Sequence, residues 1–391
     1  MKNLLPILSV ITAIVTIGSM VVYSENNSCN SLSQSWESYK DYFIQEDGRV
    51  VDFIADNITT SEGESYALLR AVWLNDKTSF DTILKWTNNN LRTRGDNLFS
   101  WKWGKDDKNK WGVLDKESAT DADQDIALAL IMAYETWKNP QYLNQAKNIL
   151  KDIWNKEVIT IGTSNYLLPG PWAIYDDNVK INPSYFAPYA YRIFAKYDSK
   201  HDWISLVDSS YDFLNKASNL SIFYLPPDWA YINKQTGQIT VNDDITNKES
   251  DFSYDAIRVM WRISFDYMLN NDSRALEYIK KSTKYLIKYW ILNKNLPGSV
   301  NISGIVTRIA DDHSFATYGA VLPAIDLVDK DIAREIYLNK VSATYMKGFW
   351  ANPKDYYGQN IIWFGLLLWL NNSNDTDNQL YKKDIFNLLK K

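Results

Sequence analysis

The chain alternates between helical segments that are apolar on almost every side and segments that have one polar face. In residues 121–137 the polar side chains gather at the start and apolar ones fill the rest. In residues 140–154, charged positions such as Lys147 alternate with apolar positions such as Leu143. A helix that is apolar all round is buried, whereas an amphipathic helix lies at the periphery. The alternation therefore predicts an inner and an outer set of helices.

Extended over most of the chain, this alternation predicts an all-α fold, an (α/α)6 barrel with six inner and six outer helices. The expected helices cover 33–43, 62–75, 78–92, 121–137, 140–154, 184–197, 200–216, 252–269, 272–291, 314–328, 330–345, 356–371 and 378–390. No linker rich in proline, glycine and serine divides them, so we expect one domain. Short β segments are expected near 158–168 and 238–241. The alternative, an open α-solenoid, would have a sharper sequence repeat.

Long segments between the expected helices should meet at one rim of the barrel and carry the functional site. They cover 93–120, 155–183, 217–251 and 292–313. The chain has 16 tryptophans and 26 tyrosines. Aromatic side chains can fill a core, but such numbers also suit a long cleft that stacks flat ligands, of which carbohydrate is the usual soluble kind. The net charge of −5 provides no basic surface for nucleic acid.

Residues 1–24 have the layout of a targeting segment. Lys2 precedes a mostly apolar run over 4–22, as in a secretory signal peptide. The run is also long enough for an uncleaved membrane anchor, which needs roughly 18 or more apolar residues. Cys29 is the only cysteine, so an internal disulfide is excluded. We expect an exported protein, periplasmic or secreted, that is monomeric and either cleaved or tethered at its N-terminal segment.

Residues 119–127, Ala-Thr-Asp-Ala-Asp-Gln-Asp-Ile-Ala, place three carboxylates at the start of an apolar helix. A solvated helix would spread its charges along one face, so this concentration indicates that a buried helix delivers a carboxylate, Asp121, into a cleft. The alternative is structural, because a helix start favours acidic side chains as caps and first-turn residues.

Two further apolar helices are expected to begin beside a carboxylate. Ser61 and Glu64 match a capping box, which leaves Glu62 without a structural role beyond that of a first-turn acid. Asp255 opens another helix, with Arg258 one turn further on. An arginine in an apolar helix requires an anionic partner, so a purely structural ion pair is the alternative there.

Converging carboxylates with aromatic walls are what glycoside hydrolysis needs. One carboxylic acid protonates the leaving oxygen, and one carboxylate activates water or attacks the anomeric carbon. His201 and His313 are the only histidines, too few for a zinc site or a serine triad. We therefore expect no metal and no cofactor.

Several segments together resemble glycoside hydrolase family 8, in the family's order and over about residues 30–370. They are A-T-D-A-D-Q-D-I-A at 119–127, S-E-G-E-S-Y at 61–66, N-P-S-Y-F-A-P at 182–188, P-D-W at 227–229 and S-Y-D-A-I-R at 253–258. Within the family the chain is most similar to the endoglucanases of bacterial cellulose-synthesis operons. Its 119–125 run is more acidic than is usual in that group and matches free-standing cellulases. The resemblance implies an (α/α)6 catalytic domain over 25–391.

The resemblance also implies an inverting mechanism and assigns roles. Glu62 would be the general acid, Asp255 the general base, and Asp121 would bind the distorted sugar at the cleavage point. Tyr185 and Arg258 would help to position the water and the base. A helix start lowers a carboxyl pKa, so an acid such as Glu62 needs burial or a neighbouring negative charge, and Asp121 is the expected source.

Two tryptophans are candidates for stacking on sugar rings, Trp101 and Trp172, although the spacing around Trp172 differs by one residue from the family's. The function implied is an endo-β-1,4-glucanase, a cellulase acting on a β-glucan oligosaccharide or polysaccharide. Chitosanase, lichenase and xylan-directed activities occur in the same family and stay open. A glucan-binding subunit without catalysis is a further alternative, against which the intact Glu62 and Asp255 argue.

Overall fold

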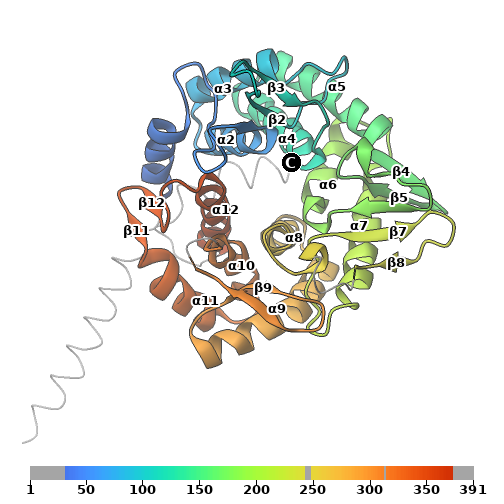
Figure 1. Ribbon diagram of the computed structural model, residues 1–391, viewed down its shortest axis with the longest axis vertical. Helices are drawn as coiled ribbons and strands as arrows, with labels where there is room; N and C mark the ends of the chain where they lie inside the picture. Colours follow the sequence, from blue (N-terminus) through green and yellow to red (C-terminus); the bar gives the residue numbers. More distant parts are fainter. Residues whose placement is uncertain (1–30, 243–247, 312–313, 373–391) are drawn as a thin grey trace, which may run out of the picture.

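In the computed structural model, the described residues are 31–242, 248–311 and 314–372. Six helices form the inner ring of this part of the chain, and each packs against its two neighbours in the ring (Figure 1). They are α2 (Ser61–Trp73), α4 (Thr120–Trp137), α6 (Pro188–Tyr197), α8 (Ile257–Asn270), α10 (Ala316–Asp326) and α12 (Tyr356–Asn372). Because α12 packs against α2, the ring is closed and the solenoid alternative is wrong.

An outer helix follows each of the first five inner helices and packs against it. These outer helices are α3 (Lys77–Asn90), α5 (Pro140–Glu157), α7 (Trp203–Ser218), α9 (Ser273–Asn293) and α11 (Lys330–Ile336), and residues 31–43 add a helix before α2. The (α/α)6 barrel is therefore confirmed. The alternation in the sequence has the expected cause, since α12 is buried from Tyr356 to Leu370 whereas α9 buries only one face.

Helix starts differ between the two rings. The side chains of Asp76, Asn139, Asp202, Asp272 and Asp329 cap the outer helices by accepting a backbone N–H of the first turn. Among the described inner helices, α4, α6, α8 and α10 have no side-chain cap. A side-chain cap stabilises a helix by about 1 kcal/mol. The inner helices without a cap therefore depend more on packing against their neighbours for their stability.

Short antiparallel strands stiffen these loops. They are β1 (Thr59–Thr60), β2 (Lys102–Lys105) and β3 (Trp111–Asp115); β4 (Val158–Ile161) and β5 (Ser164–Leu167); β6 (Asn178–Ile181), β7 (Ala230–Asn233) and β8 (Ile239–Thr240); β9 (Pro297–Val300) and β10 (Val306–Ile309); and β11 (Tyr345–Met346) and β12 (Phe349–Trp350). The β segments predicted near 158–168 and 238–241 are confirmed. The other strands were not predicted.

The four long loops are joined to one another at the amino ends of the inner helices. Strand β2 pairs with β1 just before α2, and β6 pairs with β7 from the third long loop. The backbone N–H of Thr120 donates to the carbonyl of Pro169 at 3.1 Å, and Phe252 pairs with Val300. These contacts support the expectation that the long loops share one rim.

Three predicted helices have different bounds. The segment 184–197 is interrupted, because Pro188 cannot continue a helix and starts α6 after a 3₁₀ turn, Pro183–Tyr185. The helix expected from 252 begins only at Ile257. The helix expected over 330–345 ends at Ile336 and continues as a π-helical turn.

The predictions for residues 1–24, for a helix over 378–390 and for His313 lie outside the described residues. A search of the described helices finds none that is long and apolar enough to cross a membrane.

Candidate active site

Arg258 holds together the three carboxylates that open the inner helices. Its Nη1 donates to Glu62 Oε2 and to Asp121 Oδ2, both at 2.8 Å, and its Nη2 donates to Asp255 Oδ1 at 2.8 Å. The arginine is 1% exposed, whereas the side chains of Glu62 and Asp255 are 21% and 27% exposed. One buried guanidinium thus faces three acids, two of which reach solvent.

The start of α2 explains why Glu62 is available. The helix is capped by Thr60, whose hydroxyl accepts the backbone N–H of Gly63 at 3.0 Å. The predicted capping box between Ser61 and Glu64 is wrong, because the buried carboxylate of Glu64 accepts a backbone N–H from another loop at 2.8 Å and a threonine hydroxyl at 2.9 Å. Glu62 is then the acidic residue of the first turn that faces Arg258.

Asp255 lies in the turn before α8, which begins at Ile257, and not inside the helix. Asp228 fixes this turn by accepting the backbone N–H groups of Asp255 at 3.1 Å and Ala256 at 2.7 Å. The Nδ2 atom of Asn182 donates to Asp255 Oδ2 at 3.1 Å. Asp228 and Asn182 belong to the P-D-W and N-P-S-Y segments, but sequence reasoning gave them no role.

Burial dominates the electrostatics of the two partly exposed acids. Burial raises the pKa of Glu62 to about 7, against the opposing effect of Arg258, and the negative charge of Asp121 adds to the rise. Burial also raises the pKa of Asp255, where Arg258 again acts in the opposite direction. Asp121 was expected to supply the neighbouring negative charge that raises the pKa of Glu62, and it contributes to the rise, although less than burial does.

Two tyrosines complete the surroundings of Glu62. The hydroxyl of Tyr356 donates to Glu62 Oε1 at 3.0 Å, and that of Tyr66 donates to Oε2 at 3.4 Å. Burial raises the pKa of both phenols well above the usual range, so both remain donors. Tyr66 lies in the S-E-G-E-S-Y segment, whereas Tyr356 opens an apolar helix and had no signal in the sequence.

A row of aromatic rings leads from Arg258 along the rim. The ring of Tyr185 lies 5.3 Å from the Arg258 guanidinium, Trp229 lies 6.4 Å from Tyr185, and Trp172 lies 6.1 Å from Trp229. Trp172 is 39% exposed, and its indole N–H donates to the carbonyl of Ser118 at 3.2 Å. The structure thus brings Tyr185 and Trp172 to the same side of the site, with Trp229 between them.

Trp101 is joined through its backbone to the start of α2, at the residue before Glu62. Its carbonyl accepts the backbone N–H of Ser61 at 3.0 Å, and its ring is half-buried. The neighbouring Trp103 has a different environment, since it packs edge-on against Trp86 at 5.3 Å and joins the hydrophobic core.

One turn deeper in the barrel, Arg262 forms a closed ion pair. It donates to both carboxylate oxygens of Asp125, at 3.0 and 2.6 Å, and to the hydroxyl of Tyr189 at 2.8 Å. Arg262 is fully buried and the side chain of Asp125 is 1% exposed. Both arginines of α8 therefore have the anionic partners that the sequence required. Within the described ranges, no cluster of three histidine, cysteine or acidic residues is placed to hold a metal ion.

Comparisons with known proteins agree with this architecture. A family model for glycosyl hydrolases family 8 matches residues 7–369. The endoglucanase of Escherichia coli (strain K12) is 35% identical over 257 residues, which are 64% of this chain and 67% of that protein. The endo-1,4-D-glucanase of Vibrio fischeri ES114 superposes with a TM-score of 0.72 at 29% identity, over 88% of this chain and 96% of that one.

A β-1,3-1,4-glucanase from Paenibacillus sp. X4 shares the fold, with a TM-score of 0.75 at 21% identity over 89% of this chain and 93% of that one. The family match covers most of the sequence, and the closed ring of helices with its carboxylate-lined rim is the structure expected for it. The chain belongs to glycosyl hydrolases family 8.

Proposed function

We propose that this chain is an endo-β-1,4-glucanase that hydrolyses internal bonds of a β-glucan with inversion, using Glu62 as general acid and Asp255 as general base. The observation that carries the proposal is the sharing of one buried guanidinium, Arg258, by Glu62, Asp121 and Asp255 at the open rim of the barrel. Inversion needs two carboxyl groups about 6.5–9.5 Å apart, with room for a water between them.

The environment of Glu62 suits a proton donor. A general acid works best when its pKa lies near the working pH, because it must be protonated and still give up its proton. Burial raises the pKa of Glu62 to about 7. In the reaction, Glu62 would pass its proton to the oxygen of the leaving sugar, and Tyr356 and Arg258 would stabilise the carboxylate that remains.

Asp255 has the partners of a positioned base. Arg258 and Asn182 each hold one of its carboxylate oxygens, so its orientation is fixed before substrate arrives. It would take a proton from the water that attacks the anomeric carbon. Tyr185, whose ring lies against Arg258, would border that water, and Asp121 would bind the sugar at the cleavage point.

The substrate assignment rests on two supports. Relatives at 35% and 29% identity carry the names endoglucanase and endo-1,4-D-glucanase. The row of Tyr185, Trp229 and Trp172 provides flat apolar surfaces for successive sugar rings.

We also propose that the enzyme acts outside the cytoplasm, because residues 4–22 form an apolar run typical of a targeting segment. Cell fractionation tests this proposal.

Proton NMR of the first products decides the mechanism. A β-linked cello-oligosaccharide should release the α-anomer first, and initial release of the β-anomer would mean retention and would overturn the roles of Glu62 and Asp255. Carboxymethylcellulose, chitosan, lichenan and xylan assayed side by side test the substrate. A rapid fall in the viscosity of carboxymethylcellulose, relative to the reducing ends formed, is expected for internal cleavage.

A further inference from the structure

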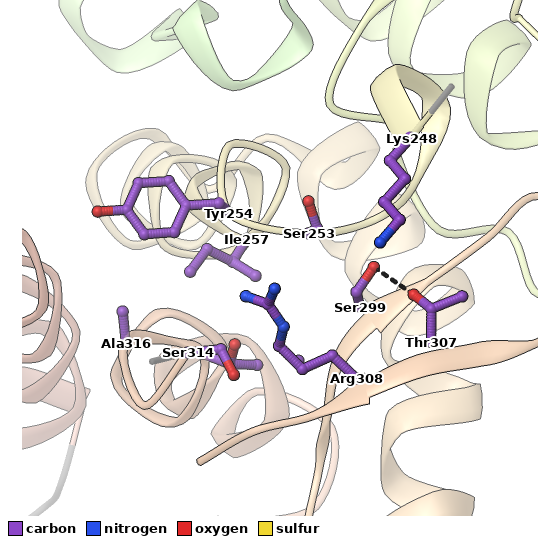
Figure 2. A pocket seen from close by; sticks show the side chains of 11 residues that line it. Lys248, Ser253, Tyr254, Ile257, Ser299, Thr307, Arg308, Ser314 and Ala316 are labelled. Carbon is purple, nitrogen blue, oxygen red and sulfur yellow. Dashed lines mark hydrogen bonds between the residues drawn. The ribbon is translucent and has the colours of Figure 1, made fainter. Parts of the chain in front are cut away.

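A pocket beside the proposed base carries positive charge that the reaction does not use. It has a volume of about 100 Å³ and is lined by Lys248, Ser253, Tyr254, Ser299, Thr307 and Arg308, among others (Figure 2). A single water needs about 10–15 Å³, so the pocket admits a carboxylate or a phosphate group.

Two cations reach this pocket from different elements. Figure 2 shows the ammonium group of Lys248 and the guanidinium group of Arg308 both directed into it. Lys248 begins a 3₁₀ turn before α8, and Arg308 lies on β10. Both side chains belong to exposed residues, and within the described part of the chain neither forms an ion pair.

Asp251, an acidic residue close to Lys248, is already engaged. Asp251 accepts a hydrogen bond from the hydroxyl of Ser299 at 3.0 Å, and Lys248 lies within electrostatic range of it. Ser299 in turn accepts from the hydroxyl of Thr307 at 2.8 Å. Among the described residues that line the pocket, two are cations and none is acidic, although the chain as a whole is negative.

The pocket adjoins the turn that carries the proposed base. Ser253 and Tyr254, which line it, immediately precede Asp255 in the same turn. The ring of Tyr254 is 48% exposed and stacks on Tyr357 at 4.1 Å between centroids. The lining of the pocket therefore begins one residue before the proposed base.

We propose that this pocket binds an anionic group, a carboxylate or a phosphate, attached to the glucan that occupies the cleft. The inference rests on the proposed function and narrows its substrate class to glucans that carry acidic substituents. Lys248 and Arg308 supply the charge, and the pocket recognises the substituent and takes no part in bond cleavage.

The test compares unmodified cello-oligosaccharides with ones in which some C6 hydroxyl groups are oxidised to carboxylates. Affinities are measured by calorimetry, and hydrolysis is measured separately. An exposed charge contact changes affinity by about 1.5- to 5-fold. The double variant Lys248→Gln/Arg308→Gln should therefore reduce the preference for the oxidised ligand by about 2- to 25-fold and leave affinity for the unmodified one unchanged.

A matched control removes the same charge elsewhere. Lys147 and Lys151 lie exposed on the outer helix α5, and the variant Lys147→Gln/Lys151→Gln should keep the preference. Equal effects of the two double variants, or an equal loss on both ligands, would overturn the inference. A second outcome would also overturn it. In that outcome, inorganic phosphate inhibits the hydrolysis of unmodified oligosaccharide in the native enzyme but not in the Lys248→Gln/Arg308→Gln variant, while the oxidised oligosaccharide binds no more tightly than the unmodified one. The pocket would then bind free phosphate and not a substituent of the glucan.

The two proposals fail in different ways. Binding that prefers the oxidised ligand without hydrolysis of either would refute the proposed function and support the pocket. Hydrolysis of both ligands without a preference in binding would refute the pocket and support the proposed function.

Discussion

Arg258 and Arg262 lie one turn apart on α8, and each faces a carboxylate of α4, yet the balance of charge around them differs. Arg262 meets one carboxylate, Asp125, and both are fully enclosed. Arg258 meets Asp121 and two further acids, Glu62 from α2 and Asp255 from the turn that leads into α8. The deeper pair is neutral, whereas the cluster at the rim has more negative than positive charge.

This difference is the one expected between a structural ion pair and the catalytic cluster that we propose at the rim. A buried charge is tolerated when it has one well-placed partner, and Asp125 binds Arg262 through both oxygens. Around Arg258, burial raises the pKa of Glu62 and the negative charges of the neighbouring acids add to the rise, so the three acids are not all readily ionised. A surplus that costs stability and is partly exposed is the arrangement expected where chemistry takes place.

Removal of one acid from the rim cluster should have the largest effect of all, and this effect should be on the catalytic rate and not on the stability of the fold. Glu62→Gln keeps the shape but cannot donate a proton, so kcat on a soluble β-1,4-glucan should fall by about 10²–10⁴. Circular dichroism should match that of the native enzyme, and the melting temperature should be close to the native one at a pH of about 4.5 or below, where Glu62 is protonated. The control Glu64→Gln alters a buried carboxyl two residues away and should affect stability more than kcat. If the Glu62→Gln enzyme kept a tenth of its activity, the proposed catalytic role of the Arg258 cluster would be contradicted.

Removal of the acid from the deeper pair should instead affect stability. Asp125→Ala leaves Arg262 buried without a partner, and such a break typically costs about 3–5 kcal/mol. Urea unfolding measures this loss. The double variant Asp125→Leu/Arg262→Met should be less destabilised than Asp125→Ala, because no unpaired charge remains. Asp121→Asn, one turn above, should change stability little, and a loss as large as that of Asp125→Ala would show that the two regions are not different.

The pH dependence of rate and of stability tests whether the pKa of Glu62 is raised in the Arg258 cluster. Above a pH of about 7, Glu62 loses its proton in the folded enzyme, and kcat should fall by about tenfold per pH unit. The folded pKa lies above the ordinary value of 4.5, so the stability that Glu62 contributes is complete below 4.5 and is lost as the pH rises through about 7. Glu62→Gln should therefore gain stability relative to the native enzyme across that window. An unchanged difference between pH 4 and 8, measured by denaturant unfolding, would argue against the raised pKa.

The smallest effect is expected at the aromatic walls. Trp101→Ala should weaken oligosaccharide binding by the ~0.5–1.5 kcal/mol of an aromatic contact, about 2- to 13-fold, at an unchanged melting temperature. Trp103→Ala is the matched control, because Trp103 packs against Trp86 and Trp111 and its loss should lower the melting temperature. A large fall in melting temperature for Trp101→Ala would place that ring in the core.

Much of the fold could be predicted because its signals are local. Burial of a helix depends on which of its own faces are apolar, and the alternation of 121–137 with 140–154 was sufficient to indicate two rings. Helix bounds were less accurate where a single residue or a turn decided them, as at Pro188 and at Ile257. The short strands pair across long loops, and only two of their positions had a recognisable pattern.

The candidate site divides in the same way. Glu62, Asp121 and Asp255 could be selected from the sequence because each is a carboxylate at or just before the start of an apolar helix. Their partners could not be selected so directly. Asn182 is 73 positions from Asp255, and Tyr356 is 294 positions from Glu62.

The sequence by itself determined the inner and outer helices, the acids placed at the rim and the arginines that would need them, because these follow from periodicity and from the cost of burying a charge. Only the tertiary structure decided that Arg258 bridges all three acids while Arg262 binds one. Arg258 lies 196 positions from Glu62 and 137 from Asp121. The raised pKa of Glu62 likewise comes from burial and neighbours that the closed barrel brings together, and such through-space effects have no counterpart in local sequence.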